Sequence, residues 1–257
     1  MTTHFIIPDT QCTPGDTYEH LEAAGNYIVD KQPDVIIHLG DHWDMASLSS
    51  YEKRGSKYFE GKSYRADIEA GLEGMEALFL PINKYNKRKK KNKEKQYKPR
   101  MVFTFGNHDG SRLQRALNDD PRLEGTIGFE DFQLDKFGWE VYDFLVPVNI
   151  DSIYYSHYFY NPSTGKPYGG QVSTRLNNIG FSFTQGHQQG KQIGEKHLAN
   201  GNTIRGLICG SFYQHNEAYR GPQATNEWRG CIHKTDVKDG NYCLTELSMD
   251  YLLKEWY

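Results

Sequence analysis

Cysteines are few in this sequence, and long apolar runs are absent. The four cysteines, Cys12, Cys209, Cys231 and Cys243, are scattered over 257 residues without a CxxC pair, so neither a disulfide framework nor a cysteine zinc site is expected. No apolar run approaches the roughly 20 residues that span a bilayer. Met1–Asp9 lack the basic start and long apolar stretch of a secretory signal. We therefore expect a cytoplasmic protein without a membrane partner.

Neither sign of charge dominates the chain. The formal net charge of −3 gives no global attraction to nucleic acid. The basic excess of the first half is concentrated in Lys84–Arg100 (KYNKRKKKNKEKQYKPR). We expect a solvated loop or a frayed helix end there, with nucleic-acid contact as the alternative. The composition, with 37% hydrophobic and 14% aromatic residues, is typical of a globular protein and excludes a disordered chain.

The order of the predicted elements indicates a mixed α/β protein. Neither a repeat nor a clear linker is found, so a single domain over residues 1–257 is expected. Helices are predicted over Thr17–Lys31 and Ser63–Lys90, and Pro81 should break or kink the second. Lys238–Asn241 is a hairpin signal. Strands are predicted at His4–Pro8, Asp34–Leu39, Met101–Phe105, Ile153–Tyr155, Phe181–Thr184, Thr203–Cys209, Gly230–Val237 and Tyr242–Leu247. Alternating β and α followed by mostly β favours two sheets.

Polar clusters stand at the ends of the first five predicted strands. They are Asp9-Thr10-Gln11, Gly40-Asp41-His42-Trp43-Asp44, Gly106-Asn107-His108-Asp109, Ser156-His157 and Gly186-His187-Gln188-Gln189. Each alone is explained as a helix cap, a turn or a packed histidine. Together they predict one rim, because the loops beyond strand carboxyl ends gather ligands in sheet-based folds. Carboxylate, amide and imidazole groups suit Mn²⁺, Fe or Zn²⁺ better than Ca²⁺.

These clusters resemble the calcineurin-like metallophosphoesterases, whose pattern is D-x-H, G-D-x-x-D, G-N-H-[DE], H and G-H-x-H. The segments IIPDTQ, SHYFYNP, KPYGG, GHQQ and GPQ…WRG are similar to a subgroup encoded by bacteriophages and prophages, whose proteins work in the host cytoplasm. The resemblance covers nearly the whole chain. It implies a four-layer α-β-β-α sandwich of two mixed sheets and a metal-dependent phosphoester hydrolase.

The resemblance also implies roles for individual residues around two divalent cations. Asp41 would bridge the cations; Asn107, His157 and His187 would complete one site; Asp9, Gln11 and Gln189 would lie at the other. His108 would act as general acid or contact a phosphate oxygen, and Asp44 would orient a neighbouring histidine. A bridging hydroxide would attack the phosphorus.

Two positions depart from the family pattern. Gln11 and Gln189 stand where the family has histidine, and an amide offers only an oxygen to a metal. An all-oxygen site favours Mn²⁺ or Mg²⁺ over the softer Zn²⁺ or Fe. The alternative is an empty first site and an impaired enzyme.

The substrate is the least determined property. Arg112, His42 and His215 are candidate substrate contacts, although an ordinary surface or packing role is open for each. The basic tract and the Tyr-rich loop after His157 favour a phosphodiesterase or nuclease acting on nucleic acid or nucleotides. The alternatives are a phosphomonoesterase or protein phosphatase, and a metal- or nucleic-acid-binding module without turnover. The oligomeric state is left open.

Overall fold

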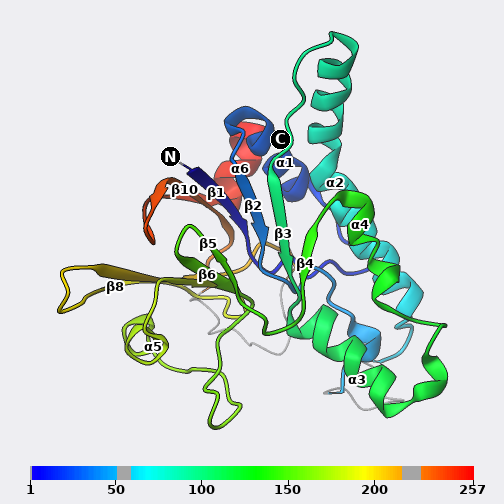
Figure 1. Ribbon diagram of the computed structural model, residues 1–257. Coiled ribbons are helices and arrows are strands. Elements are labelled where there is room, and N and C mark those ends of the chain that lie inside the picture. The colour runs from blue at the N-terminus through cyan, green and yellow to red at the C-terminus, as the bar shows by residue number, and fades with distance from the viewer. Residues whose placement is uncertain (1, 51–58, 216–226) are drawn as a thin grey trace.

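Two β-sheets pack face to face in the computed structural model, which describes residues 2–50, 59–215 and 227–257 (Figure 1). The six-stranded sheet has the order β11-β10-β1-β2-β3-β4. Its strands are β1 (Thr2–Ile7), β2 (Val35–His38), β3 (Arg100–Thr104), β4 (Glu140–Tyr142), β10 (Gly230–Lys238) and β11 (Asn241–Ser248). Strands β1 to β4 are parallel, whereas β10 and β11 pair antiparallel. Residues 221–223, the GPQ of one family-like segment, lie outside the described ranges.

The second sheet has five strands in the order β5-β6-β7-β9-β8. They are β5 (Val148–Ile150), β6 (Ile153–Ser156), β7 (Phe183–Gln185), β8 (Lys191–His197) and β9 (Thr203–Cys209). The central strands β6, β7 and β9 are parallel, and β5 and β8 pair antiparallel at the edges. Both sheets are therefore mixed, as predicted.

Alternation of side chains along the buried strands explains the layers. On β1, Phe5 and Ile7 join the core beneath the helices, whereas Ile6 points into the core between the two sheets. Ile153 and Tyr155 of β6 enter the same inter-sheet core. A strand apolar on both faces must be covered on both sides, and a continuous apolar run such as Val35–Ile37 is the sequence signature of that position.

Helices cover the outer face of each sheet. Helices α1 (Glu19–Lys31), α2 (Tyr64–Lys91) and α6 (Met249–Trp256) pack on the six-stranded sheet, and α5 (Val172–Ile179) packs on the five-stranded sheet. Two shorter helices, α3 (Arg112–Asp119) and α4 (Leu134–Phe137), come between β3 and β4 in the sequence. The predicted α-β-β-α order is thus confirmed. Among the described helices, none combines the length and apolar character needed to cross a bilayer.

The predicted break at Pro81 is wrong, because α2 continues from Tyr64 to Lys91 with Pro81 buried inside it. The reason is close packing against α1. A Cβ added to Gly25 of α1 would lie 2.3 Å from the Leu78 carbonyl oxygen and 3.1 Å from the Pro81 ring. This glycine lets the two helices approach closely, and the buried contact supports the helix across the proline. The tract expected as a loop or frayed end is therefore helical as far as Lys91.

The other predicted elements are present with shifted ends. The hairpin between β10 and β11 turns at Lys238–Asn241, as predicted. Strands β4, β5 and β8 and helices α4, α5 and α6 were not predicted, since their sequences are short or carry many polar residues.

Candidate metal centre

The first three polar clusters meet at one edge of the six-stranded sheet. Asp9, Asp41 and Asn107 follow the carboxyl ends of the adjacent parallel strands β1, β2 and β3. The first two loops are joined directly, because the backbone N–H of Gln11 donates to the Asp41 carbonyl oxygen at 2.8 Å. Ligands collect at this edge in open α/β sheets. The parallel register, more than any single residue, brings these side chains together.

The second sheet supplies two histidines to the same place. His157 and His187 follow the parallel strands β6 and β7. One ligand atom from each of Asp41, His157 and His187 lies within 4.8 Å of the others. His157 Nε2 also lies 2.9 Å from the Asn107 side-chain oxygen. Among the described residues, Asp41, His157 and His187 are the group of acidic, histidine or cysteine side chains placed to hold a metal ion.

His157 is oriented by the backbone. Its Nδ1 lies 2.8 Å from the Leu39 carbonyl oxygen, to which it donates, so Nε2 faces Asp41 at 3.2 Å. Metal-binding histidines commonly use their second nitrogen in this way. Burial lowers the pKa of His157, but the Asp41 charge outweighs it and raises the pKa to about 10. His157 must lose its proton before Nε2 can bind a metal.

Asp41 and His187 hold complementary charge states. Burial alone would raise the pKa of Asp41, but the neighbouring His157 and His108 hold it well below its usual range. Although the His187 side chain is exposed at the rim, the protein around it and then the charge of His157 lower its pKa below the ordinary value. At neutral pH the rim therefore offers an anionic carboxylate beside a neutral imidazole, the two states that bind divalent metals.

Two glycines make room for the carboxylates. A Cβ at Gly106 would lie 2.1 Å from Asp41 Oδ1, and one at Gly186 would lie 2.3 Å from Asp9 Oδ1. Asp9 Oδ1 in turn accepts a hydrogen bond from the His187 backbone N–H at 3.0 Å. Burial, reinforced by the Asp41 charge, raises the pKa of Asp9 to about 7. The glycines of the G-N-H-D and G-H motifs are thus required by close approach.

The two glutamines that stand where the family has histidine each have a buried side-chain oxygen without a hydrogen-bond partner. Among the described residues, Gln11 Oε1 and Gln189 Oε1 are buried and accept no hydrogen bond. An unsatisfied buried carbonyl costs about 1–3 kcal/mol, and a hard cation is one partner that would satisfy it. This donor chemistry fits a divalent metal bound through oxygens.

His108 is held on the other side of Asp41. Its Nδ1 lies 2.7 Å from Asp44 Oδ1, and its backbone N–H donates to Asp41 Oδ1 at 2.7 Å. Arg112 donates through one nitrogen to the Asp44 carbonyl oxygen at 2.6 Å, and its other terminal nitrogen lies 3.3 Å from His108 Nε2. Burial lowers the pKa of His108, but the charges of Asp41 and Asp44 raise it overall. The two carboxylates thus favour the charged form of this imidazole, whereas its burial opposes that form.

Asp109 is a positioning residue to which the sequence patterns gave no role. Its fully buried carboxylate accepts hydrogen bonds from the backbone N–H groups of Gly106 at 2.7 Å, Gly110 at 2.8 Å and His42 at 2.9 Å. It therefore joins the loop after β2 to η2 (Asn107–Ser111), the single π-helical turn that carries His108. The signal in the sequence is an acidic residue inside a glycine-flanked turn.

Two of the predicted substrate contacts lie elsewhere. His42 is fully buried, with Nδ1 2.6 Å from the Thr10 hydroxyl and Nε2 2.8 Å from the Gly71 carbonyl oxygen. Both ring nitrogens are engaged inside the protein, which supports the packing alternative over substrate contact. His215 lies 3.1 Å from Asp16 and stacks on Tyr213. It is not among the residues brought together at the cluster.

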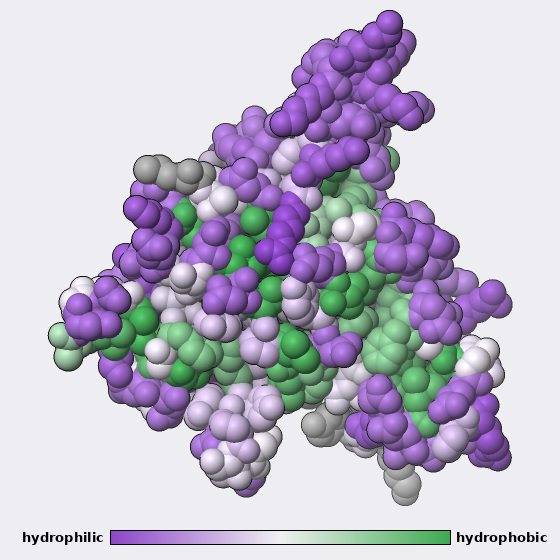
Figure 2. Space-filling view, in the orientation of Figure 1, coloured by the Kyte–Doolittle hydropathy of each residue, from purple (hydrophilic) through white to green (hydrophobic). Residues whose placement is uncertain are grey.

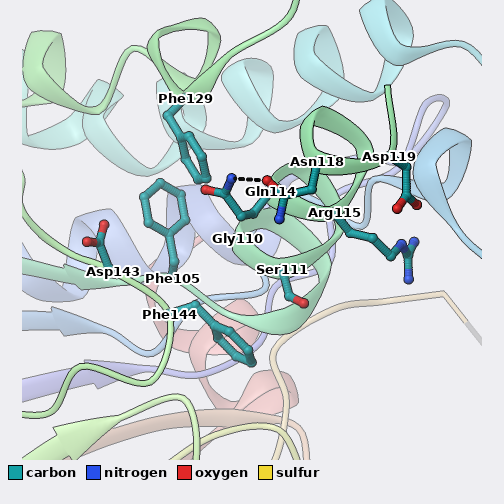
Figure 3. A pocket seen from close by; sticks show the side chains of 10 residues that line it. All are labelled: Phe105, Gly110, Ser111, Gln114, Arg115, Asn118, Asp119, Phe129, Asp143 and Phe144. Atoms are coloured by element: carbon teal, nitrogen blue, oxygen red, sulfur yellow. Dashed lines mark hydrogen bonds between the residues drawn. The ribbon is translucent and has the colours of Figure 1, made fainter. Parts of the chain in front are cut away.

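A cavity of about 470 Å³ adjoins the turn that carries His108 (Figure 3). Phe105, Phe129 and Phe144 form its apolar walls. Its remaining lining residues are Gly110, Ser111, Gln114, Arg115, Asn118, Asp119 and Asp143. The Phe144 ring lies 6.3 Å from the His157 ring, so the cavity begins next to the metal-binding edge. Its size and aromatic walls suit a small organic group.

The sequence and the structure were compared with those of known proteins. A family model described as calcineurin-like phosphoesterase matches residues 3–236. A conserved uncharacterized protein from Streptococcus pneumoniae TIGR4, titled a predicted phosphoesterase, is 14% identical, with a TM-score of 0.36, over 97% of this chain and 90% of its own. Yfce, a phosphoesterase from E. coli, is 11% identical, with a TM-score of 0.39, over 96% of this chain and 99% of its own. No curated protein matches the sequence. The family match includes every residue of the cluster.

Proposed function

Since the chain belongs to the calcineurin-like phosphoesterase family, a family of metal-dependent hydrolases, we propose that it is a phosphodiesterase acting on nucleic acid or nucleotides. The observation that carries the site assignment is the convergence of Asp41, His157 and His187 at the shared edge of the two sheets. We propose that Asp9 and the buried, unpartnered oxygens of Gln11 and Gln189 belong to the same site. These residues and Asn107 form the ligand set of our proposal.

We propose two divalent cations, with Mn²⁺ favoured and Mg²⁺, Fe or Zn²⁺ as alternatives. Bound cations of this kind polarise phosphoryl oxygens and lower the pKa of a coordinated water. The ligand set is chemically uneven, since two imidazoles lie on one side and two amides on the other. Hard oxygen donors favour Mn²⁺ and Mg²⁺ over softer ions.

The side chains of the protein would contribute a negative charge, from Asp41, and a proton, from His108, to the reaction. Asp41 remains anionic at neutral pH, and Asp44 keeps the His108 ring turned with Nε2 toward Asp41 at 3.8 Å. We propose that His108 donates a proton from Nε2 to the leaving oxygen, as an imidazole can near neutral pH. Arg112 holds the Asp44 backbone and approaches His108 Nε2, and we propose that its guanidinium contacts a phosphate oxygen of the substrate.

The diester preference rests on the basic tract Lys84–Arg100 and on the aromatic groups near the cluster. Tyr158 lies beside both ligand histidines, with ring centroids 5.9 Å from His157 and 4.8 Å from His187. Aromatic faces stack on nucleobases. We also propose that the chain belongs to the subgroup encoded by bacteriophages and prophages, on the segments that resemble it. The protein would then work in the host cytoplasm.

The test is hydrolysis of bis-p-nitrophenyl phosphate by chelator-treated protein supplied with Mn²⁺, Mg²⁺, Zn²⁺ or no metal, with Asp41→Asn in parallel. We expect metal-restored activity that Asp41→Asn abolishes, while circular dichroism shows the variant folded. A preference for p-nitrophenyl phosphate would replace the proposal with a phosphomonoesterase. Inactivity with every metal and both substrates would overturn it in favour of a module without turnover.

A further inference from the structure

The far end of helix α2 carries an unusually dense positive charge. Residues 84–98, here called the basic arm, contain nine lysine or arginine residues and one acidic residue, Glu94. Eight of the nine are exposed: Lys84, Lys87, Arg88, Lys90, Lys91, Lys93, Lys95 and Lys98. In the part of the chain that the structure describes, Lys89 with Glu94 is the arm's one ion pair. Most of this charge is therefore uncompensated.

The basic arm projects from the body of the protein. Figure 1 shows the last turns of α2 extending beyond the sheets, and Figure 2 shows this projection as an almost wholly hydrophilic surface. It is nevertheless ordered against its own return strand. The Asn86 side chain donates to the Tyr97 carbonyl oxygen at 2.8 Å and accepts from the Tyr97 N–H at 2.9 Å, and the Tyr97 hydroxyl bonds to the Pro33 carbonyl oxygen at 2.5 Å.

The helical part of the basic arm is folded although its neighbouring positive charges repel one another. Lys87 lies three and four residues before Lys90 and Lys91 on the helix, and like charges at these spacings destabilise a helix by about 0.2–0.5 kcal/mol per pair. A bound polyanion would remove that repulsion. The arm also lacks the apolar face with which amphipathic helices enter a membrane, since the only apolar or aromatic residue in its helical part is Tyr85.

The arm lies at the opposite end of the sheet from the metal-binding edge. Helix α2 leaves the carboxyl end of β2 and returns the chain to the start of β3, a strand parallel to β2. Near its beginning, the Gly71 carbonyl oxygen contacts His42, which follows Asp41. From Gly71 to Lys91 the helix rises about 30 Å, at 1.5 Å per residue. The arm therefore cannot contribute to the catalytic edge itself.

We propose that the basic arm is a remote anchor for the phosphate backbone of nucleic acid, contacting a polymeric substrate about 20 to 30 Å along helix α2 from Gly71, which lies beside the catalytic edge. The proposal rests on the proposed diester hydrolysis for its link to turnover, whereas binding by the arm does not depend on it. At 3.4 Å per base pair, the 30 Å to Lys91 corresponds to about nine base pairs. Substrates shorter than this cannot reach from the catalytic edge to the end of helix α2.

The experiment compares the triple variant Lys87→Gln, Lys90→Gln and Lys91→Gln with a control, Lys136→Gln, Lys238→Gln and Lys254→Gln. The control removes the same charge from exposed lysines elsewhere. The probe is fluorescent DNA hairpins with stems of about 6, 12 and 24 base pairs, bound in EDTA over a range of salt concentrations. For the two longer stems, we expect the arm variant to reduce the slope of log K against log salt by about 2 to 3, at about 0.9 per phosphate contact.

Three further readouts separate anchoring from other roles. When DNA hydrolysis is measured with the divalent cation supplied, KM should rise in the arm variant only for stems longer than about nine base pairs, while kcat stays unchanged. Hydrolysis of bis-p-nitrophenyl phosphate should be equal in all three proteins, and its loss in the wild type would overturn the proposed function alone. The melting temperature of the arm variant should equal or exceed that of the wild type, because repulsion is relieved.

The proposal is overturned if the arm and control variants lose salt dependence equally, or if neither does. It is also overturned if the wild type binds anionic phosphatidylserine vesicles through the arm but not DNA, since that result would identify a membrane surface as the partner.

Discussion

The buried lysine between the two sheets makes a quantitative prediction. Lys234 is fully buried, with its ammonium group 3.4 Å from the Tyr155 hydroxyl and 4.2 Å from the centre of the Tyr242 ring. It also bonds to the Thr184 hydroxyl. Burial lowers its pKa from the ordinary value of 10.5 to about 7. Carrying the charge inside the folded protein at pH 7 therefore costs on the order of 5 kcal/mol, at 1.36 kcal/mol per pKa unit.

The sign of the pH dependence follows from proton binding. Between pH 7 and pH 10.5 the unfolded chain keeps the Lys234 proton and the folded protein releases it, so stability rises with pH. Below pH 7 both states are protonated and the full cost is present. From pH 7 to pH 9 the free energy of unfolding should increase by about 2 kcal/mol from this group. The adjacent His4 does not titrate in this window, since burial and then the Lys234 charge lower its pKa to about 4.

Lys234→Met isolates the effect, because methionine keeps an unbranched side chain without the charge. Urea unfolding at pH 7 and pH 9 gives the stability difference between variant and wild type at each pH. We expect the variant to gain stability relative to the wild type at pH 7, and to lose about 2 kcal/mol of that advantage at pH 9. Lys254→Met, at an exposed position, should show no such change. A difference that is the same at both pH values would refute the reasoning.

Three further predictions concern the metal-binding edge. Gly186→Ala should displace Asp9, whose Oδ1 would lie 2.3 Å from the new Cβ, and the expected result is a lost Mn²⁺-induced rise in melting temperature with far-ultraviolet circular dichroism retained. Gln189→His should shift the metal preference from Mn²⁺ toward Zn²⁺, because imidazole is the softer ligand; parallel metal titrations by calorimetry measure it, and an unchanged ranking would contradict the ligand assignment. Asp44→Asn should lower kcat by about 10- to 100-fold through misorientation of His108, with metal affinity kept; an equal loss of metal affinity would show that Asp44 acts on the ligands instead.

The strands and their rim could be predicted because the information is local. Each apolar run ends in a polar cluster, and parallel pairing then brings Asp9, Asp41 and Asn107 to one edge. The continuity of α2 could not be predicted, since it depends on Gly25, which meets Pro81 only after folding. The same limit applies to the interior of the site.

His42 illustrates what local patterns leave open. The sequence leaves a substrate contact open for it beside a slightly favoured surface or packing role. Its environment is decided by Thr10 and Gly71, which flank it from two other segments. Asp109 stood in a recognised motif, yet its three backbone partners become apparent only when two loops are side by side. The roles of the metal ligands and of His108 stay predictions until the metal titrations are made.

The hydrogen bond between the His187 backbone and Asp9 joins residues 178 positions apart, and this separation bears on how the protein matures. A nascent chain that has been synthesised just beyond β6 already contains Asp9, Asp41, Asn107 and His157, but it has no His187. Contacts of such long sequence separation form late and slowly in folding. Metal acquisition should therefore be a late event of biosynthesis, after nearly three quarters of the polypeptide has been synthesised, and a prematurely terminated chain would be unable to hold the ion.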